Sequence, residues 1–399
     1  MDNDQKKTNS DIRLLMGAAS FFGAASGIFI STLNNYLSEV HGLDAAARGW
    51  LELPRELPGF LIMFVSALLL TVMRETKMVA LAMVLTAIGA LGLGFIETGM
   101  TPLIIFIIIW SLGDHVIFAL EGPIGLKLAK KGATGRRLGQ LGGARNFGAI
   151  VGVGAVYLSS KLVGDNYKLF YSFAAASALA AGILYFKLKV GLDEAPSRRI
   201  VLKKKYGVFY AISVLFGVRK QIFLAFGTWV LVRIHGVPVS TIAMLYFIAA
   251  VIGVIFRPLL GDIIDWLGER VVLATDEVLL LLICMAYAFA GDIFSTPYDL
   301  YLLYFAYVFD SVLFALRIAR TTYLKKIADT PADITPTASM GVTIDHSVAM
   351  TLPILSGYIW QEFGYRWVFI MASAIAIVGF FICLKIKTPP RNLATQTAR

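Results

Sequence analysis

Long apolar stretches and short polar breaks alternate along the whole chain. A helix that rises about 1.5 Å per residue needs roughly 20 apolar residues to cross a bilayer. Segments of that kind predict twelve helices, at about 14–37, 50–73, 78–97, 102–128, 138–161, 168–187, 208–234, 238–257, 271–291, 299–324, 338–361 and 366–386. The pattern therefore predicts an all-α integral membrane protein.

The longest run of charge lies in the middle of the chain, where 187–205 reads KLKVGLDEAPSRRIVLKKK. We interpret 187–207 as a cytoplasmic basic linker between an N-terminal six-helix half, 1–186, and a C-terminal six-helix half, 208–399. Short motifs recur about 195 residues later in the second half: Phe22-Gly23 as Phe216-Gly217, His41-Gly42 as His235-Gly236, and Asp114-x-x-x-Phe118 as Asp310-x-x-x-Phe314. The near-constant offset indicates two pseudo-symmetric halves.

Composition supports a membrane protein and excludes other classes. Hydrophobic residues make up 58% of the chain and charged ones 16%, whereas soluble domains are about half apolar and about a quarter charged. The net charge of +10 comes from basic residues in short loops, which argues against a nucleic-acid partner. Their distribution follows the positive-inside rule if both termini are cytoplasmic. We expect a multi-pass protein of the plasma (inner) membrane, with the lipid bilayer as partner and a monomer sufficient for function.

No motif for enzyme chemistry, a metal or a cofactor is visible. Cys284 and Cys383 lie in apolar spans without metal-ligand spacing, and the four histidines are scattered along the chain. We therefore expect no enzyme, no cofactor and no metal.

One loop motif is specific enough to suggest a family. Gly261-x-x-x-Asp265-x-x-Gly268-x-Arg270 is similar to the cytoplasmic loop motif of the major facilitator superfamily, and the resemblance covers essentially the full chain. It implies that the glycines allow a tight turn, and that Asp265 and Arg270 bridge helix ends in one access state. The equivalent loop of the first half, MRETK, lacks the Gly and Asp.

The resemblance also implies a central cavity, with the third, sixth, ninth and twelfth helices outside it. Ionisable groups in a bilayer cost at least about 2.5 kcal/mol each, so their placement is informative. Most of them lie on the other helices: Glu52, Arg55, Glu56, Asp114, His115, Glu121, Arg145, Arg219, Lys220, Asp310, Arg317, Asp345 and His346. The ninth carries Asp276 and Glu277 near one end.

The spacing of some of these charged residues along the sequence places them on one face of a helix. Glu52, Arg55 and Glu56 share one helix face and can satisfy one another; Asp310 and Arg317 also share a face. We assign Glu52, Arg55, Glu56, Glu121 and Arg317 to an intramembrane charge network.

Lone carboxylates near mid-membrane must be paired, hydrated or protonated. Asp114 and Asp310 occupy equivalent points of the repeat, and His115 and His346 each follow an aspartate. We expect proton coupling through Asp114, His115, Asp345, His346 or Asp310.

Cations at this depth can receive an anionic solute or pair with carboxylates. We assign Arg219, Lys220, Arg145 and Asp310 to substrate binding, while Arg145 is also a candidate for a structural pair with Glu121, Asp114 or Asp345.

Together these features predict a secondary active transporter that moves a small polar or anionic solute by alternating access with proton coupling. Efflux of lipophilic compounds is an alternative, which the missing Gly-Pro step in the fifth helix disfavours. A sensor that has lost transport is less favoured, since no soluble output domain is visible.

Overall fold

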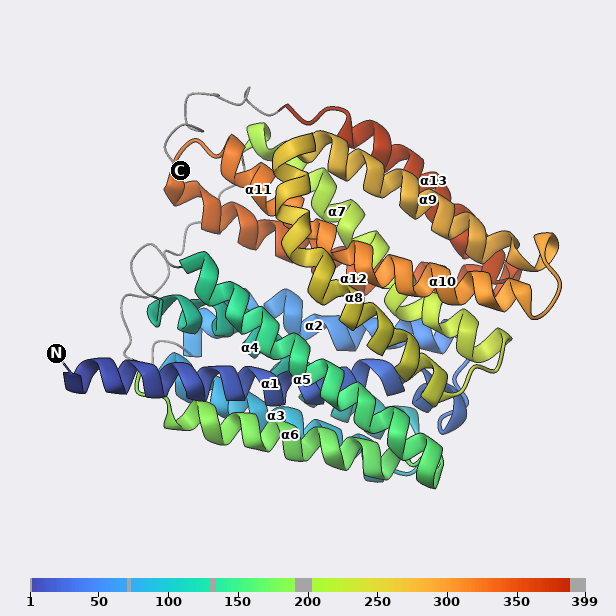
Figure 1. Cartoon of the computed structure of the whole chain (residues 1–399). Coiled ribbons are helices and arrows are strands. Elements are labelled where there is room, and N and C mark those ends of the chain that lie inside the picture. Colours follow the sequence, from blue (N-terminus) through green and yellow to red (C-terminus); the bar gives the residue numbers. More distant parts are fainter. Residues whose placement is uncertain (1, 70–72, 130–133, 191–202, 388–399) are drawn as a thin grey trace.

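The computed structural model describes residues 2–69, 73–129, 134–190 and 203–387, and these fold into helices (Figure 1). The first half of the chain forms α1 (Asp2–Glu39), α2 (Ala45–Leu69), α3 (Glu75–Phe95), α4 (Met100–Lys127), α5 (Thr134–Val163) and α6 (Tyr167–Lys187). All six overlap predicted segments, but α1 and α2 begin earlier than predicted, at Asp2 and Ala45 instead of about 14 and 50.

The second half has the same plan, with irregular turns inside two of its helices. A short turn, η1 (Lys204–Tyr206), leads into α7 (Gly207–Gln221), which continues through the π-helical turns η2 (Ile222–Gly227) and η3 (Val230–Ile234). It is followed by α8 (Val239–Leu267), α9 (Glu269–Ile293), α10 (Tyr298–Leu313), the 3₁₀ turn η4 (Phe314–Leu316), α11 (Arg317–Ile327), α12 (Pro331–Phe363) and α13 (Tyr365–Cys383). The predicted tenth helix, 299–324, is thus interrupted at η4.

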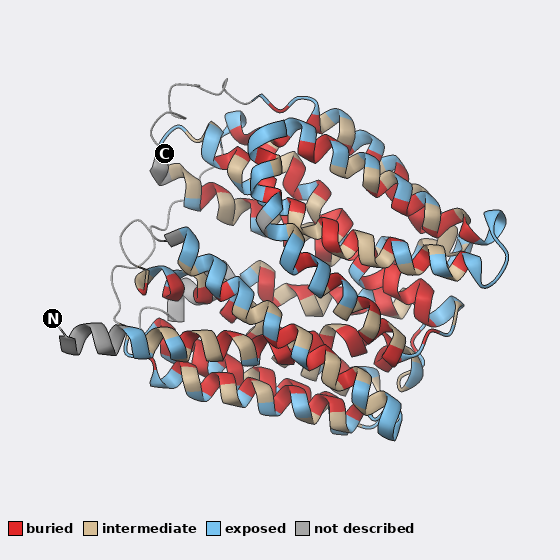
Figure 2. Ribbon diagram, viewed as in Figure 1, coloured by how far each residue is buried: buried red, intermediate tan, exposed pale blue. Residues whose placement is uncertain are grey.

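Length and composition identify most of these helices as membrane spans. Among the described residues, 10 helical stretches are long and apolar enough to cross a bilayer. The other two long helices, α2 and α12, carry the polar residues described below. Buried positions face the neighbouring helices and exposed ones the outside (Figure 2), where large apolar residues such as Phe95, Phe186 and Phe305 are exposed. The all-α membrane fold is therefore confirmed.

Packing follows the same order in each half. α1 packs on α5 and α3 on α6, and correspondingly α7 packs on α12 and α9 on α13. Between the halves, α2 packs on α12 and α5 on α8. Cys284 and Cys383 are free and buried in the second half, as expected for small apolar residues.

The sequence repeat has a structural counterpart. Gly42 and Gly236 both have φ of 61°, a conformation that glycine adopts at little cost. A Cβ on Gly23 would lie 2.0 Å from the Arg145 carbonyl oxygen, and one on Gly217 would lie 2.7 Å from that of Asp345. In both halves a glycine thus allows the first helix to approach the fifth beside a charged residue.

The two ends of the bundle are defined by the chain. We call the end where α1 begins and α13 ends the terminal face, and the opposite end the distal face (Figure 1). At the distal face, the Asn34 and Asn35 amides donate to the carbonyl oxygens of Leu224 and Val237, 3.1 and 2.9 Å away. The Trp50 indole N–H donates to the Tyr358 hydroxyl at 3.1 Å. The ribbons of the two halves lie close at this face and diverge toward the terminal face (Figure 1).

Part of the predicted linker, 191–202, lies outside the described residues, so the boundaries of the halves stay a prediction. Its last residues contact the loop before α12, since Lys203 and Lys205 both pair with Asp329. Hydrogen bonds from these two lysines lower the pKa of the Asp329 carboxyl to about 2.

Candidate functional site: a charge network between the halves

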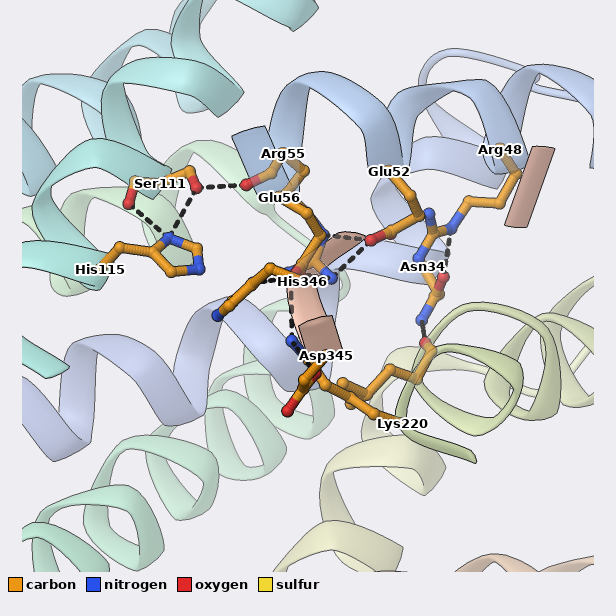
Figure 3. Close-up of polar contacts among 11 residues, drawn as sticks. Asn34, Arg48, Glu52, Arg55, Glu56, Ser111, His115, Lys220, Asp345 and His346 are labelled. Atoms are coloured by element: carbon orange, nitrogen blue, oxygen red, sulfur yellow. Dashed lines mark hydrogen bonds and ion pairs between the residues drawn. The ribbon is translucent and has the colours of Figure 1, made fainter. Parts of the chain in front are cut away.

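Glu56 lies at the centre of a polar network that joins the two halves (Figure 3). Its carboxylate accepts from Lys220 Nζ of α7 and contacts His346 Nδ1 of α12, each 2.8 Å away. Arg55 also pairs with it, at 2.7 Å. The predicted span at about 50–73 places Glu56 near the first end of its helix. Because α2 begins at Ala45, Glu56 lies near the middle of this 25-residue helix.

The network continues along α2 toward the distal face. The Glu52 carboxylate pairs with Arg55 and with Arg48, each at 2.5 Å, and Arg48 Nε donates to Asn34 Oδ1 at 2.9 Å. The predicted self-satisfying cluster of Glu52, Arg55 and Glu56 is therefore present. The predicted span at about 50–73 leaves Arg48 in the loop before it, which is wrong: Arg48 lies in the first turn of α2 with 2% of its surface exposed.

His115 reaches the same region from α4. Its Nδ1 contacts the Ser111 backbone oxygen at 2.8 Å, and the Ser111 hydroxyl donates to the Arg55 carbonyl oxygen. The His115 and His346 rings are 5.0 Å apart, at 69°. A Cβ on Gly59 would lie 2.4 Å from His115 and 2.6 Å from His346. The two imidazoles can meet because position 59 has no side chain.

The geometry of this group does not favour a metal ion. Glu56, His115 and His346 place ligand atoms within 4.8 Å of one another. However, the Glu56 carboxylate already binds Lys220 and Arg55, and two adjacent cations oppose a further positive charge. We describe the cluster as a compensated ion-pair network, not as a cation site.

Asp345 lies beside this network. Its carboxylate is 3.9 Å from Lys220 and 4.0 Å from Arg320 of α11. These separations are too long for direct hydrogen bonds, and Asp345 Oδ1 has no hydrogen-bond partner. His346 contacts Glu56 and not the neighbouring Asp345, in keeping with the divergence of adjacent residues on a helix.

Arg219 belongs to a separate ion-pair group within the second half. It pairs with Asp276 of α9 at 2.5 Å and with Asp310 of α10 at 2.9 Å, and 4% of its side chain is exposed. The expectation placed Arg219 and Asp310 at the substrate; the structure pairs them with each other. The sequence predicts no role for Asp276, whose helix the family resemblance places outside the cavity, yet Asp276 completes this group.

The first half has a matching pair. Arg145 of α5 pairs with Glu121 of α4, which also accepts from the Tyr185 hydroxyl at 2.8 Å. Of the three partners considered for Arg145, Glu121 is the one it contacts. Asp114, the repeat equivalent of Asp310, has no such arginine: its Oδ1 is buried without a hydrogen-bond partner.

The remaining predicted residues are dispersed. Arg317 starts α11 and stacks on Phe314, 5.5 Å from the ring centroid, instead of pairing with Asp310. In the loop motif, Gly268 has φ of 81° and connects α8 directly to α9, as the predicted tight turn requires. The bridging roles of Asp265 and Arg270, and any role for Gly261, stay predictions.

The chain belongs to the Major Facilitator Superfamily, whose family model matches residues 15–332. It is therefore a multi-pass membrane transporter and not an enzyme. No curated protein sequence matches it closely enough to count as a relative.

Solved structures of other transporters share the fold at low identity. A point mutant of the nucleoside transporter NupG has a TM-score of 0.79 and 16% identity, covering 94% of this chain and 99% of that one. A bacterial homolog of the human lysosomal transporter Spinster, inward-facing and unoccupied, has 0.72 and 15%, covering 96% and 99%. A D-xylose-proton symporter has 0.70 and 15%, covering 95% and 98%.

Proposed function

We propose that this secondary transporter moves a small polar or anionic solute by alternating access, coupled to protons. The observation that carries the proposal is the position of Glu56, which Lys220 and His346 of the opposite half bind in the middle of the bundle. Rocking of one half against the other has to break or rearrange these contacts. Any ligand that competes for them would couple its binding to the conformation of the transporter.

An anionic or strongly polar solute is suited to such competition. The Lys220 ammonium group lies 2.8 Å from the Glu56 carboxylate and 3.9 Å from that of Asp345. An anionic solute can replace one of these carboxylates, and the positive charge of Lys220 then stays paired with a negative charge. A neutral apolar compound offers no replacement for these charge-assisted bonds, which are roughly twice as strong as neutral ones. The network therefore favours polar solutes over the lipophilic compounds of the efflux alternative.

Proton coupling is proposed to involve Asp114, a carboxyl group that has a buried oxygen without a hydrogen-bond partner and no arginine or lysine within ion-pair distance among the described residues. A carboxylate at this depth is costly unless it is paired, hydrated or protonated. Asp114 lies next to His115 and one helix away from Arg55 and Glu56.

The D-xylose-proton symporter and the nucleoside transporter NupG, both similar in fold, lend support to a polar solute.

The test is Asp114→Asn in proteoliposomes with an imposed pH gradient. We expect the variant to bind solute and exchange it across the membrane but to lose accumulation driven by the gradient. Asp292→Asn is the matched control, because Asp292 is an exposed aspartate paired with Arg366. Gradient-driven accumulation at the wild-type level in Asp114→Asn would refute this assignment, and transport restricted to lipophilic compounds would refute the solute class.

A further inference from the structure

Three arginines on the second half's helices form a cationic group on the terminal-face side of the central network. Arg257 is the last residue of the apolar span Val239–Arg257, and Arg317 and Arg320 lie in the span Tyr298–Ile327. Arg257 and Arg317 are within electrostatic range of each other, and both are within range of Arg145 of the first half. Arg145 and Arg257 lie on α5 and α8, which pack on each other, and Arg317 follows η4, which also contacts α8.

The positive charge of these arginines exceeds the negative charge of the carboxylates near them. Asp345 is the nearest carboxylate to Arg320, at 4.0 Å, and it is shared with Lys220. Arg145 is already paired with Glu121. Arg257 and Arg317 are exposed, and within the described part of the chain neither has a carboxylate within ion-pair distance. One nitrogen of Arg320, Nη1, is buried and has no hydrogen-bond partner. About two positive charges are left without a counterion.

Aromatic rings hold two of the guanidinium groups in place. Arg320 lies 4.8 Å from the centroid of Phe216, and Arg317 lies 5.5 Å from that of Phe314. The two rings are themselves 5.0 Å apart. Stacking on an aromatic face leaves the N–H edge of a guanidinium free to bind an anion, and it limits the rotamer freedom that binding would otherwise cost.

We propose that Arg257, Arg317 and Arg320 form an anion subsite, and that the transported solute is a small dianion such as a dicarboxylate or a phosphate monoester. Two uncompensated guanidinium groups match two negative charges, and each can bind a carboxylate or phosphate with two parallel hydrogen bonds. Asp345 lies close to both Arg320 of this subsite and Lys220 of the central network. An anion bound at the subsite would therefore affect the central network through Asp345. The inference rests on the proposed function, whose solute class it narrows.

The experiment measures binding to the purified full-length protein by calorimetry, with probes that differ in charge on one skeleton. Succinate is compared with succinamate, and glycerol phosphate with glycerol. We expect each dianion to bind at least about tenfold more tightly than its less charged counterpart, the gain of one charge-assisted hydrogen bond. Equal affinity within each pair would overturn the proposal.

Variants locate the site. Arg317→Gln should weaken dianion binding at least about tenfold and Arg317→Lys should weaken it less, because the charge is kept while the bidentate geometry is lost. The matched control is Arg233→Gln, an exposed arginine near the distal face, which should bind as the wild type does. If Arg317→Gln, folded by its melting temperature, binds dianions at wild-type affinity, the subsite is wrong.

The results distinguish a failure of the anion subsite from a failure of the proposed function. Transport of neutral or singly charged polar solutes, with no binding of either dianion, would overturn the subsite and leave the proposed function standing. Transport of lipophilic compounds alone would overturn both.

Discussion

At the scale of single residues, buried charged groups are paired with groups of opposite charge, and a single substitution can leave one partner without the other. The Glu121 carboxylate has contacts with Arg145 and with the Tyr185 hydroxyl, and it is completely buried. Removing one partner of a buried ion pair leaves the other uncompensated, whereas removing both can be nearly neutral.

We therefore expect Glu121→Gln to lower the free energy of unfolding by about 3–5 kcal/mol. The double variant Glu121→Gln with Arg145→Gln should lose less than the sum of the single variants, because no unpaired charge is left. Thermal melting in detergent provides the comparison. If the loss of stability in the double variant equals the sum of the losses in the two single variants, the ion pair between Glu121 and Arg145 does not stabilise the protein.

The sequence predicted that many charged residues lie within the helical spans, but not which of them pair. Glu56 and Lys220 are separated by 164 positions, and no local spacing relates them. Asp276 was missed because its helix belongs to the outer set, although one turn of α9 faces Arg219. Pairing depends on how the helices rotate and tilt in the bundle, which the apolar pattern does not determine.

At the scale of elements, the sequence was more informative, because span length and repeated glycines reflect local constraints. The predicted spans coincide with helices, and the tight turn at Gly268 is present. The break at η4 and the π-helical turns after Gln221 were not predicted, since the residues there continue the apolar pattern without Gly or Pro at η4.

The loop motif offers a comparison of two glycines seven residues apart, Gly261 and Gly268. Gly268 has φ of 81° and ψ of 157°, a region essentially restricted to glycine, where other residues cost about 1–3 kcal/mol. Gly261 lies inside α8 with open space around its Cβ position, and Gly→Ala inside a helix is favourable by roughly 0.5–1 kcal/mol.

Gly268→Ala should therefore lower the melting temperature, and Gly261→Ala should leave it unchanged or raise it. Both substitutions add one methyl group to the same motif, so Gly261→Ala is the matched control for Gly268→Ala. Equal melting temperatures for the two variants would show that the turn tolerates a side chain and that its conformation is not the reason for the glycine.

At the scale of the whole molecule, the two halves are held together by distal-face contacts and by the central network. Asn34 binds Leu224 at the distal face and has 5% of its surface exposed, so it reports on separation of the halves there. Glu56 provides the central link through Lys220 and His346. Hydrogen bonds to charged groups contribute about 1.5–3 kcal/mol each, and loss of even one shifts a two-state equilibrium by about tenfold or more.

Glu56→Gln should therefore populate states in which the distal face opens. In an Asn34→Cys background, we expect Glu56→Gln to raise the rate of maleimide labelling at position 34 by about tenfold or more. The two native cysteines are buried and should add little background. Glu269→Gln is the control: it removes an equally buried carboxylate that pairs with Lys326 inside one half, so it should destabilise the protein without increasing labelling. If both variants raise labelling alike, the cause is general loosening of the bundle; if only Glu56→Gln does so, the contact between the halves restrains their separation.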